Sequence, residues 1–137
     1  MSLSWIAESP ARWDADKERI IGGAPSGVFA LSGTEGSLVP GDWWRVEHNG
    51  AVIGYGWMDV TWGYAPVLVA VDPAAQDKGT GRFVMDKLAA EAKERGLHYI
   101  FNVIPASHPD TIGLKQFLEK CGFQSSEADP RMLRRRV

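Results

Sequence analysis

One stretch of the chain, residues 67–81, constrains the fold more than any other. Its first five residues, Val67-Leu-Val-Ala-Val71, are all apolar, and a short polar turn with Gly79 and Gly81 follows. The sequence then continues as an amphipathic helix through Arg82-Phe-Val-Met-Asp-Lys-Leu88. The pattern therefore predicts a buried strand that passes through a glycine-rich turn into a helix.

A turn of this kind is suited to binding phosphate. The first N–H groups of a helix have no partner within the helix, and the helix dipole adds positive charge at the same point. Gly79 and Gly81 carry no side chain that would block a ligand, while Lys78 and Arg82 add charge. A P-loop is excluded because Arg82-Phe83 follows the last glycine, and a Rossmann turn is excluded because Val84 occupies the third-glycine position.

The motif Gln76-Asp-Lys-Gly79-Thr-Gly81, preceded by Val71-Asp72-Pro73, resembles the acetyl-CoA loop of the GNAT superfamily of N-acetyltransferases. The later segment Thr111–Phe123, which ends in Gly122-Phe123, resembles that family's last helix. The resemblance covers roughly residues 67–123. It implies an α/β (α+β) fold with a mixed, mostly antiparallel central sheet and helices on both faces. It also implies acetyl transfer from acetyl-CoA to a primary amine by direct attack in a ternary complex.

The resemblance assigns the acetyl-CoA site residue by residue. The strand before the loop would bind the pantetheine arm and the thioester carbonyl, the loop would bind the pyrophosphate, and the later helix would contact the arm. The predicted residues are Val69, Ala70, Val71, Gln76, Asp77, Lys78, Gly79, Thr80, Gly81, Arg82 and Thr111.

Two positions depart from the family pattern. Leu118 stands where many members carry a tyrosine acid, and Ala65 stands where some carry a glutamate base. We therefore take His108, Tyr64 and Asp59 as candidate catalytic groups. Each has a structural alternative: a helix-capping histidine, a packing aromatic and a solvated carboxylate, respectively.

Candidate acceptor contacts lie on the hairpin before the cofactor strand. Glu47 could bind a substrate ammonium group, and Trp57 and Trp62 could line an acceptor cleft. Packing in the core is the alternative for each tryptophan, and solvation is the alternative for Glu47. No metal site is predicted, and Cys121 lies in an apolar helix stripe typical of a buried, inert thiol.

Composition limits the remaining possibilities. The 137 residues predict one domain, 1–137, and the formal net charge of −2 argues against nucleic-acid binding driven by bulk charge. No apolar run is long enough to span a bilayer and no secretory signal is evident, so we expect a cytoplasmic protein that requires no membrane. The acceptor would be a small-molecule or peptide amine. The alternative function is a non-catalytic acyl-CoA sensor or partner-interaction module.

Local patterns predict the remaining elements. Asn49-Gly50 predicts a hairpin between strands at 42–47 and 51–60. The other predicted strands are 3–7, 28–31, 66–71 and 97–104, and the predicted helices are 11–21, 81–95 and about 109–121. A last hairpin is expected from 124–127 and 132–137. Arg134-Arg-Arg136 is interpreted as part of an edge strand, which would permit a homodimer.

Overall fold

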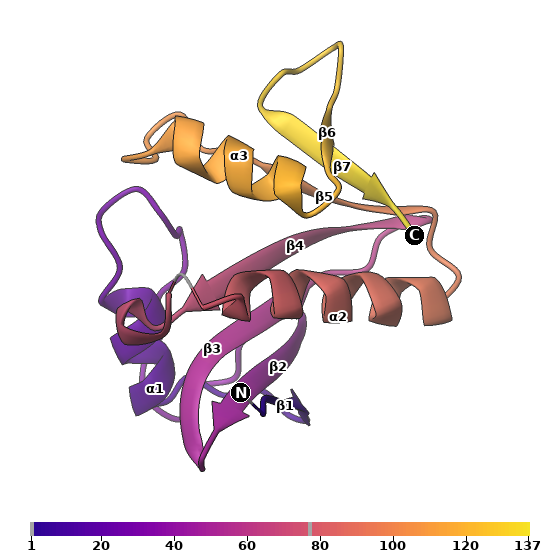
Figure 1. Ribbon diagram of the computed structural model, residues 1–137. Helices are drawn as coiled ribbons and strands as arrows, with labels where there is room; N and C mark the ends of the chain where they lie inside the picture. The colour runs from indigo at the N-terminus through magenta and orange to yellow at the C-terminus, as the bar shows by residue number, and fades with distance from the viewer. Residues whose placement is uncertain (1, 77) are drawn as a thin grey trace.

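A computed structural model describes residues 2–76 and 78–137 and contains one sheet of seven strands in the order β1-β2-β3-β4-β5-β7-β6 (Figure 1). The strands are β1 Ser4–Glu8, β2 Asp42–His48, β3 Ala51–Met58, β4 Tyr64–Val71, β5 Tyr99–Val103, β6 Gln124–Ser125 and β7 Met132–Arg136. All neighbouring strands are antiparallel except β4 and β5, which are parallel. This is the mixed, mostly antiparallel α/β sheet that the sequence predicts.

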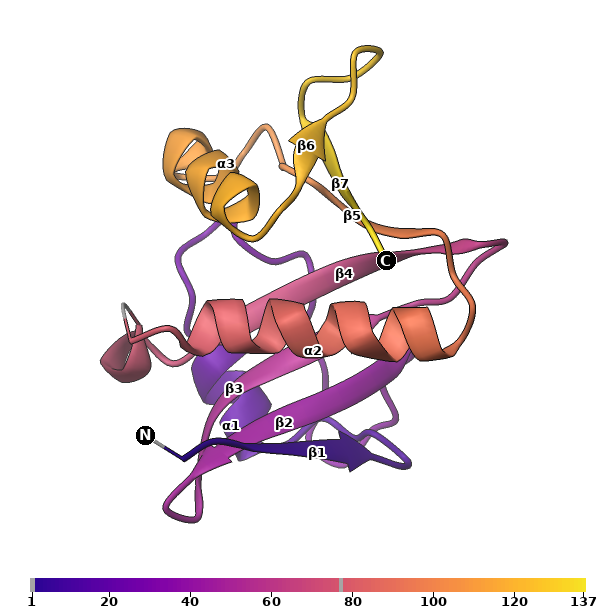
Figure 2. The same ribbon diagram turned by 45° about the vertical axis from the view of Figure 1, so that its right-hand side comes forward.

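Helices cover both faces of the sheet (Figures 1 and 2). On one face, α2 (Thr80–Glu94) and α3 (Thr111–Lys120) pack into an apolar cluster that includes Val67, Val84, Leu88, Ile100, Leu118 and Leu133. On the opposite face, α1 (Ala15–Lys17) and a π-helical turn, η1 (Glu18–Gly22), help to form a second cluster that includes Trp13, Ile20, Ile21, Trp43, Tyr55 and Ala70. A 3₁₀ turn, η2 (Pro73–Ala75), joins β4 to the loop before α2.

The predicted hairpin is confirmed. Asn49 and Gly50 both have positive φ, at 53° and 76°, which is the conformation of a two-residue turn whose twist matches the flanking strands. β2 and β3 pair on either side of the turn, with one irregularity in register between Val46 and Glu47. The long strand after the hairpin, the helix that follows it and the parallel strand beyond also form as predicted.

Three local predictions are wrong. Residues 28–31 form no strand; Phe29 and Leu31 instead pack from an irregular segment against the second cluster. The first helix begins at Ala15 rather than at residue 11, because the Asp14 side chain caps it by accepting from the Lys17 N–H at 2.8 Å. β7 is not an edge strand, since it lies between β5 and the two-residue β6.

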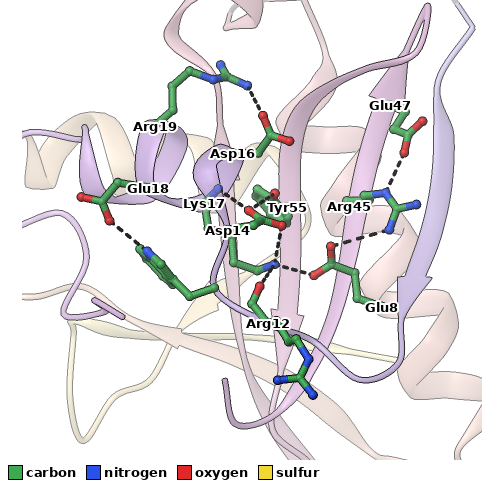
Figure 3. A network of polar contacts seen from close by, with 11 residues as sticks. Glu8, Arg12, Asp14, Asp16, Lys17, Glu18, Arg19, Arg45, Glu47 and Tyr55 are labelled. Carbon is green, nitrogen blue, oxygen red and sulfur yellow. Dashed lines mark hydrogen bonds and ion pairs between the residues drawn. The ribbon is translucent and has the colours of Figure 1, made fainter. Parts of the chain in front are cut away.

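The N-terminal segment is attached to the sheet through a buried lysine (Figure 3). Lys17 has no exposed surface; its Nζ lies 2.6 Å from Glu8 Oε1 and 2.7 Å from the Arg12 carbonyl oxygen. The same ammonium group lies 4.8 Å from the centre of the Tyr55 ring. Burial raises the pKa of Tyr55, so its hydroxyl stays protonated and donates to Asp14 Oδ1 at 3.3 Å. Lys17 therefore holds α1 to β1 through the ion pair with Glu8 and to β3 through the Tyr55 ring.

Candidate functional site

β4 and β5 separate after a short paired region. Their parallel register runs from Tyr64↔Tyr99 to Pro66↔Phe101 and then stops, although β4 continues to Val71. The Asn102 side chain donates to the Val67 carbonyl oxygen at 2.8 Å, just beyond the last pair. Figure 1 shows the two strands diverging from there, β5 towards α3 and β4 towards the loop before α2. The two strands thus bound a gap in the middle of the sheet.

Backbone groups of β4 line this gap. Asp72 N–H donates to the Ile53 carbonyl oxygen at 2.8 Å, so hydrogen bonds to β3 fall on even-numbered residues of β4. The N–H groups of Val69 and Val71 therefore lie on the opposite edge, towards the gap. Ala70, which the sequence places among the carbonyl-binding residues, belongs to the β3 side, and its N–H does not reach the gap.

The glycine-rich loop lies at the end of the gap, where α2 begins. Gly79 adopts the left-handed conformation with φ 81° and precedes α2 without a side-chain cap. The first hydrogen bond into the helix runs from the Phe83 N–H to the Gly79 carbonyl oxygen at 3.0 Å, which leaves the N–H groups of Thr80, Gly81 and Arg82 without a partner inside the helix. We call residues 78–82 the cradle.

Close packing places the cradle beside α3. A Cβ atom at Gly81 would lie 3.0 Å from Cε1 of Phe117, which explains a glycine at this position. Thr80 is buried, and its hydroxyl lies 3.5 Å from the Ala75 carbonyl oxygen. The start of α2 is thus held between η2 and α3.

The charged side chains of the loop are free to meet a ligand. Lys78 is exposed, and the Arg82 side chain is 65% exposed with only a 4.0 Å approach to Asp86. The Gln76 side chain folds back and donates to the Val71 carbonyl oxygen at 3.2 Å, so it shapes the loop. Asp77, also predicted to contact the cofactor, lies outside the described residues.

An ion pair from the N-terminal segment supports this loop. Arg19 pairs with Asp72 and also donates to the Val52 carbonyl oxygen at 3.0 Å. Asp72 in turn accepts from the Ala74 N–H at 3.0 Å and so caps η2. The Ala74 N–H, together with Arg19, lowers the pKa of Asp72, so the pair stays ionised well into the acid range.

We expect Arg19→Gln to weaken CoA binding about fivefold, or ~1 kcal/mol, because Asp72 then fixes η2 less firmly. Arg95→Gln is the matched control: Arg95 forms a similar partly exposed pair with Asp42 at 2.7 Å, remote from the cradle. Calorimetric titration with CoA checks both variants. Equal affinities for the wild type and Arg19→Gln would show that the loop does not depend on this ion pair.

The Arg19–Asp72 pair should also make the free energy of unfolding depend on pH in the acid range. Because the pKa of Asp72 is lowered in the folded protein, its stabilising effect is present above the ordinary carboxyl pKa and is lost as the pH falls through the lowered value. The difference in unfolding free energy between wild type and Asp72→Asn should therefore shrink between about pH 5 and pH 2. Urea unfolding across that range measures it, and a difference that grows on acidification would contradict the assignment.

Of the candidate catalytic groups, His108 lies at the far end of the gap and is already hydrogen-bonded. Its ring Nδ1 accepts from the Asp110 backbone N–H at 2.9 Å, and the backbone N–H of His108 donates to the Pro105 carbonyl oxygen at 3.1 Å. These bonds match the capping alternative, with Nδ1 unprotonated and Nε2 left for other contacts. Leu118, in the position of the family tyrosine, is only 1% exposed and belongs to the core.

Asp59 lies at the start of the gap, and Tyr64 lies two residues before it on β4. Asp59 N–H donates to the Pro66 carbonyl oxygen at 3.3 Å, which sets Asp59 opposite Pro66, the last residue of β4 to pair with β5. The Tyr64 ring stacks on Tyr99 with centroids 5.3 Å apart. Leu68 and Ala70 pack against the second cluster, so by alternation Tyr64, Pro66 and Asp59 point to the face away from α2.

That face continues over β5 and β7. Ile100 and Leu133 point into the cluster beneath α2, so the residues on either side of them point the other way. The pairs Tyr99↔Arg136 and Phe101↔Arg134 therefore lie beside Tyr64 and Pro66. We call the six residues the outer face: Tyr64, Pro66, Tyr99, Phe101, Arg134 and Arg136.

The remaining predicted contacts lie elsewhere. Glu47, on β2, is bonded to Arg45 at 2.6 Å, and the structure does not bring it to the gap. Trp62 is 93% exposed in the turn between β3 and β4 and lines a surface hollow with Arg95 and Leu97 near the end of α2. Trp57 packs against the second cluster, and its indole N–H donates to the Pro40 carbonyl oxygen at 3.0 Å. Thr111 is the exposed first residue of α3.

Sequence reasoning missed the segment that crosses the end of the gap. Gly27 has φ 89°, and a Cβ there would lie 2.1 Å from the Ser107 carbonyl oxygen, so the backbone of the N-terminal loop touches the loop after β5. Figures 1 and 2 show this loop rising towards α3. Phe29 and Leu31 follow on the second-cluster side. Pro25-Ser-Gly27 signals a turn, but nothing in the sequence states what the turn contacts.

The described part of the chain supports neither a metal site nor a membrane-spanning helix. Among residues 2–76 and 78–137, no group of three or more His, Cys, Asp and Glu side chains is placed to hold a metal ion. Within the same residues, no helix has the length and apolar character needed to cross a bilayer.

Comparison with known families gives one match, and solved structures give many. Residues 40–125 match the model of the Acetyltransferase (GNAT) domain. Comparison with proteins of curated function finds no match. N-acetylglutamate synthase from Neisseria gonorrhoeae, complexed with coenzyme A and N-acetyl-glutamate, aligns with all of this chain at TM-score 0.74 and 20% identity, over 35% of its own length.

Two further structures show the same fold over part of the chain. A GNAT-family acetyltransferase from Desulfovibrio desulfuricans aligns at TM-score 0.58 and 17% identity over 68% of this chain and 64% of its own. The PaiA N-acetyltransferase from Thermoplasma acidophilum, in complex with coenzyme A, aligns at TM-score 0.61 and 14% identity over 69% of this chain and 60% of its own. This chain thus spans less than two thirds of the length of each of these relatives.

Proposed function

This chain belongs to the GNAT acetyltransferase family, and from that premise we propose that it transfers an acetyl group from acetyl-CoA to a primary amine. The observation that carries the proposal is the joining of two features: a gap between β4 and β5 lined by free backbone N–H groups, and a helix-start cradle at its end. Such a pair accommodates a long molecule with an anionic head and an acyl tail.

The cradle would hold the pyrophosphate of acetyl-CoA. Its N–H groups and the α2 dipole favour an anion, and Lys78 and Arg82 add positive charge. The β4 edge would bind the pantetheine arm, with the N–H groups of Val69 and Val71 as donors. An N–H aimed at the thioester oxygen would stabilise the charge that forms there during attack.

The acceptor would approach from the outer face, because α2 and α3 cover the other side. A neutral amine attacks the thioester carbon, a C–N bond forms and the C–S bond breaks. The proton lost by the amine passes to a base, and the released thiolate is protonated to give CoA. Much of the acceleration would come from holding both reactants together.

Asp59 is the base that the geometry favours, because it lies opposite Pro66 at the start of the gap and, among the described residues, forms no ion pair. Tyr64, on the same face, is a candidate proton donor to the thiolate. His108 is a weaker candidate, since its Nδ1 is occupied in the turn. The amide and CoA are then the only products.

Direct attack is favoured over a covalent acyl-enzyme. Cys121 is 3% exposed, and burial raises the pKa of its thiol, so it is a poor nucleophile. It also lies in the cluster beneath α2 and not on the gap. A ternary complex of protein, acetyl-CoA and amine follows.

We extend the proposal to the protein's setting. The acceptor is a small-molecule or peptide amine, and the protein acts in the cytoplasm. The formal net charge of −2 supports action without nucleic acid or an anionic membrane surface. A homodimer remains part of this proposal, but β7 is internal. The edges of the sheet are β1 and the two-residue β6, and β1 is the longer strand available for pairing.

A second function, an acyl-CoA sensor without turnover, draws on the burial of Leu118 and Ala65, which leaves the usual acid and base positions without a polar group. Initial-rate measurements of free CoA thiol distinguish the two. We expect release that requires an amine, with intersecting lines when both substrates are varied. Saturable binding of acetyl-CoA without amine-dependent release would favour the sensor.

A further inference from the structure

The outer face carries aromatic rings next to the gap. Tyr64 stacks on Tyr99 at 5.3 Å, and Tyr64 lies 5.7 Å from Phe101, as centroid distances. All three side chains are partly exposed, and Phe101 belongs to the last pair before the strands separate. The rings therefore form a platform next to the point where β4 and β5 separate, and a flat apolar group fits such a platform.

The platform ends in positive charge. The Arg134 guanidinium lies 5.4 Å from the centre of the Tyr99 ring, and Arg136 is the cross-strand partner of Tyr99. Both arginines are exposed and, among the residues that the structure describes, neither forms an ion pair. Strands β4 to β7 contain no Asp or Glu at all. This side of the face therefore attracts a carboxylate and repels a polycation.

On the other side of the platform, Asp59 is the carboxylate that the described residues place beside Pro66. Two carboxylates farther along the sheet, on β1 and β2, are engaged: Glu8 by Lys17 and Glu47 by Arg45. From β3, where Asp59 follows, to β7 are three inter-strand steps, or about 14 Å between backbones. An amine held at Asp59 and a carboxylate held at Arg134 must therefore stand at opposite ends of a spacer.

We infer that the acceptor is a primary amine separated from a carboxylate by a flat apolar spacer, bound with its ammonium group at Asp59, its ring on Tyr64 and Phe101, and its carboxylate at Arg134. This inference rests on the proposed function and names its substrate class. Polyamines and aminoglycosides, which carry several positive charges and no carboxylate, are poor acceptors.

Three amines and one variant test the inference through acetyl-CoA-dependent thiol release. 4-(Aminomethyl)benzoate carries amine, ring and carboxylate; benzylamine lacks the carboxylate; spermidine is a polycation. We expect kcat/KM to be at least about tenfold higher for 4-(aminomethyl)benzoate than for either other amine, the effect of one charge-assisted contact. Arg134→Gln should lower kcat/KM for 4-(aminomethyl)benzoate at least about tenfold more than for benzylamine, and so remove that preference.

The ratio of the two aromatic amines within one variant does not depend on how much of the protein is folded. Arg12→Gln is the matched control for charge, since Arg12 contacts the Gly36 carbonyl oxygen away from the outer face. A preference for spermidine, or an equal loss with both aromatic amines in Arg134→Gln, would overturn the inference and leave the proposed function standing. Binding of acetyl-CoA without release by any amine would overturn both.

Discussion

Replacing Lys17 with methionine should lower the free energy of unfolding by about 3–5 kcal/mol. The ammonium group is fully buried and has Glu8 at 2.6 Å, so its removal leaves a carboxylate that is 9% exposed with only Arg45, at 3.7 Å, as a counter-charge. The substitution also removes the contacts of the ammonium group with the Tyr55 and Trp43 rings. Urea unfolding at neutral pH measures the change.

Two variants separate charge from packing. Lys93→Met, on the exposed last turn of α2, should cost less than about 1 kcal/mol. Glu8→Gln combined with Lys17→Met should cost clearly less than the two single changes added, because neither charge is then left buried alone. A loss below 1 kcal/mol in Lys17→Met itself would mean that the ion pair does not hold the N-terminal segment to the sheet.

Gly79→Glu should weaken CoA binding by at least about 100-fold, or ~2.7 kcal/mol. The space around Gly79 is open, since a Cβ there meets nothing within 4 Å, so a side chain fits. Its carboxylate would stand where the N–H groups and dipole of α2 favour an anion, and it would repel the pyrophosphate. Calorimetric titration with CoA measures the loss.

Gly36→Glu is the matched control. Gly36 also has positive φ, 83° against 81°, and a Cβ there also meets nothing within 4 Å. Both variants therefore carry the same backbone strain of about 1 kcal/mol and the same added charge, but only one places it in the cradle. Equal CoA affinity in the two variants would show that the loop is a turn and not a phosphate site.

The strand, turn and helix around Gly79 could be predicted because their signals are local. Five apolar residues, two glycines and an amphipathic repeat each fix a backbone conformation within a few residues. Asn49-Gly50 is local in the same way, and its hairpin is confirmed. The parallel arrangement of β4 and β5 follows from the helix that joins them.

What could not be predicted depends on contacts between distant residues. α1 begins only after Asp14, because the Asp14 side chain accepts from the Lys17 N–H. The apolar spacing of residues 11–21, by contrast, is typical of a helix that begins at residue 11. Phe29 and Leu31 have the apolar pattern of a strand, but they pack against the second cluster and do not pair with a strand. β7 becomes internal because residues 124–125 fold back on it, although its arginines are typical of an edge.

The candidate site shows the same division. Gly79 and Gly81 could be placed from the motif, whereas the side of β4 on which Ala70 bonds depends on register with β3. The sequence pattern predicts that Glu47 and Trp62 lie near the acceptor. In the structure, Glu47 forms an ion pair with Arg45, and Trp62 is exposed in the turn after β3. The Arg19–Asp72 pair joins residues 53 positions apart, which no local pattern reveals.

Acetyl transfer is tested by incubating the wild-type protein with acetyl-CoA and 4-(aminomethyl)benzoate, benzylamine or spermidine, and identifying the products by mass spectrometry. We expect an N-acetylated amine in at least one mixture, formed in equal amount with free CoA and absent without protein. Unchanged acetyl-CoA in every mixture, or free acetate with no acetylated amine, would contradict it.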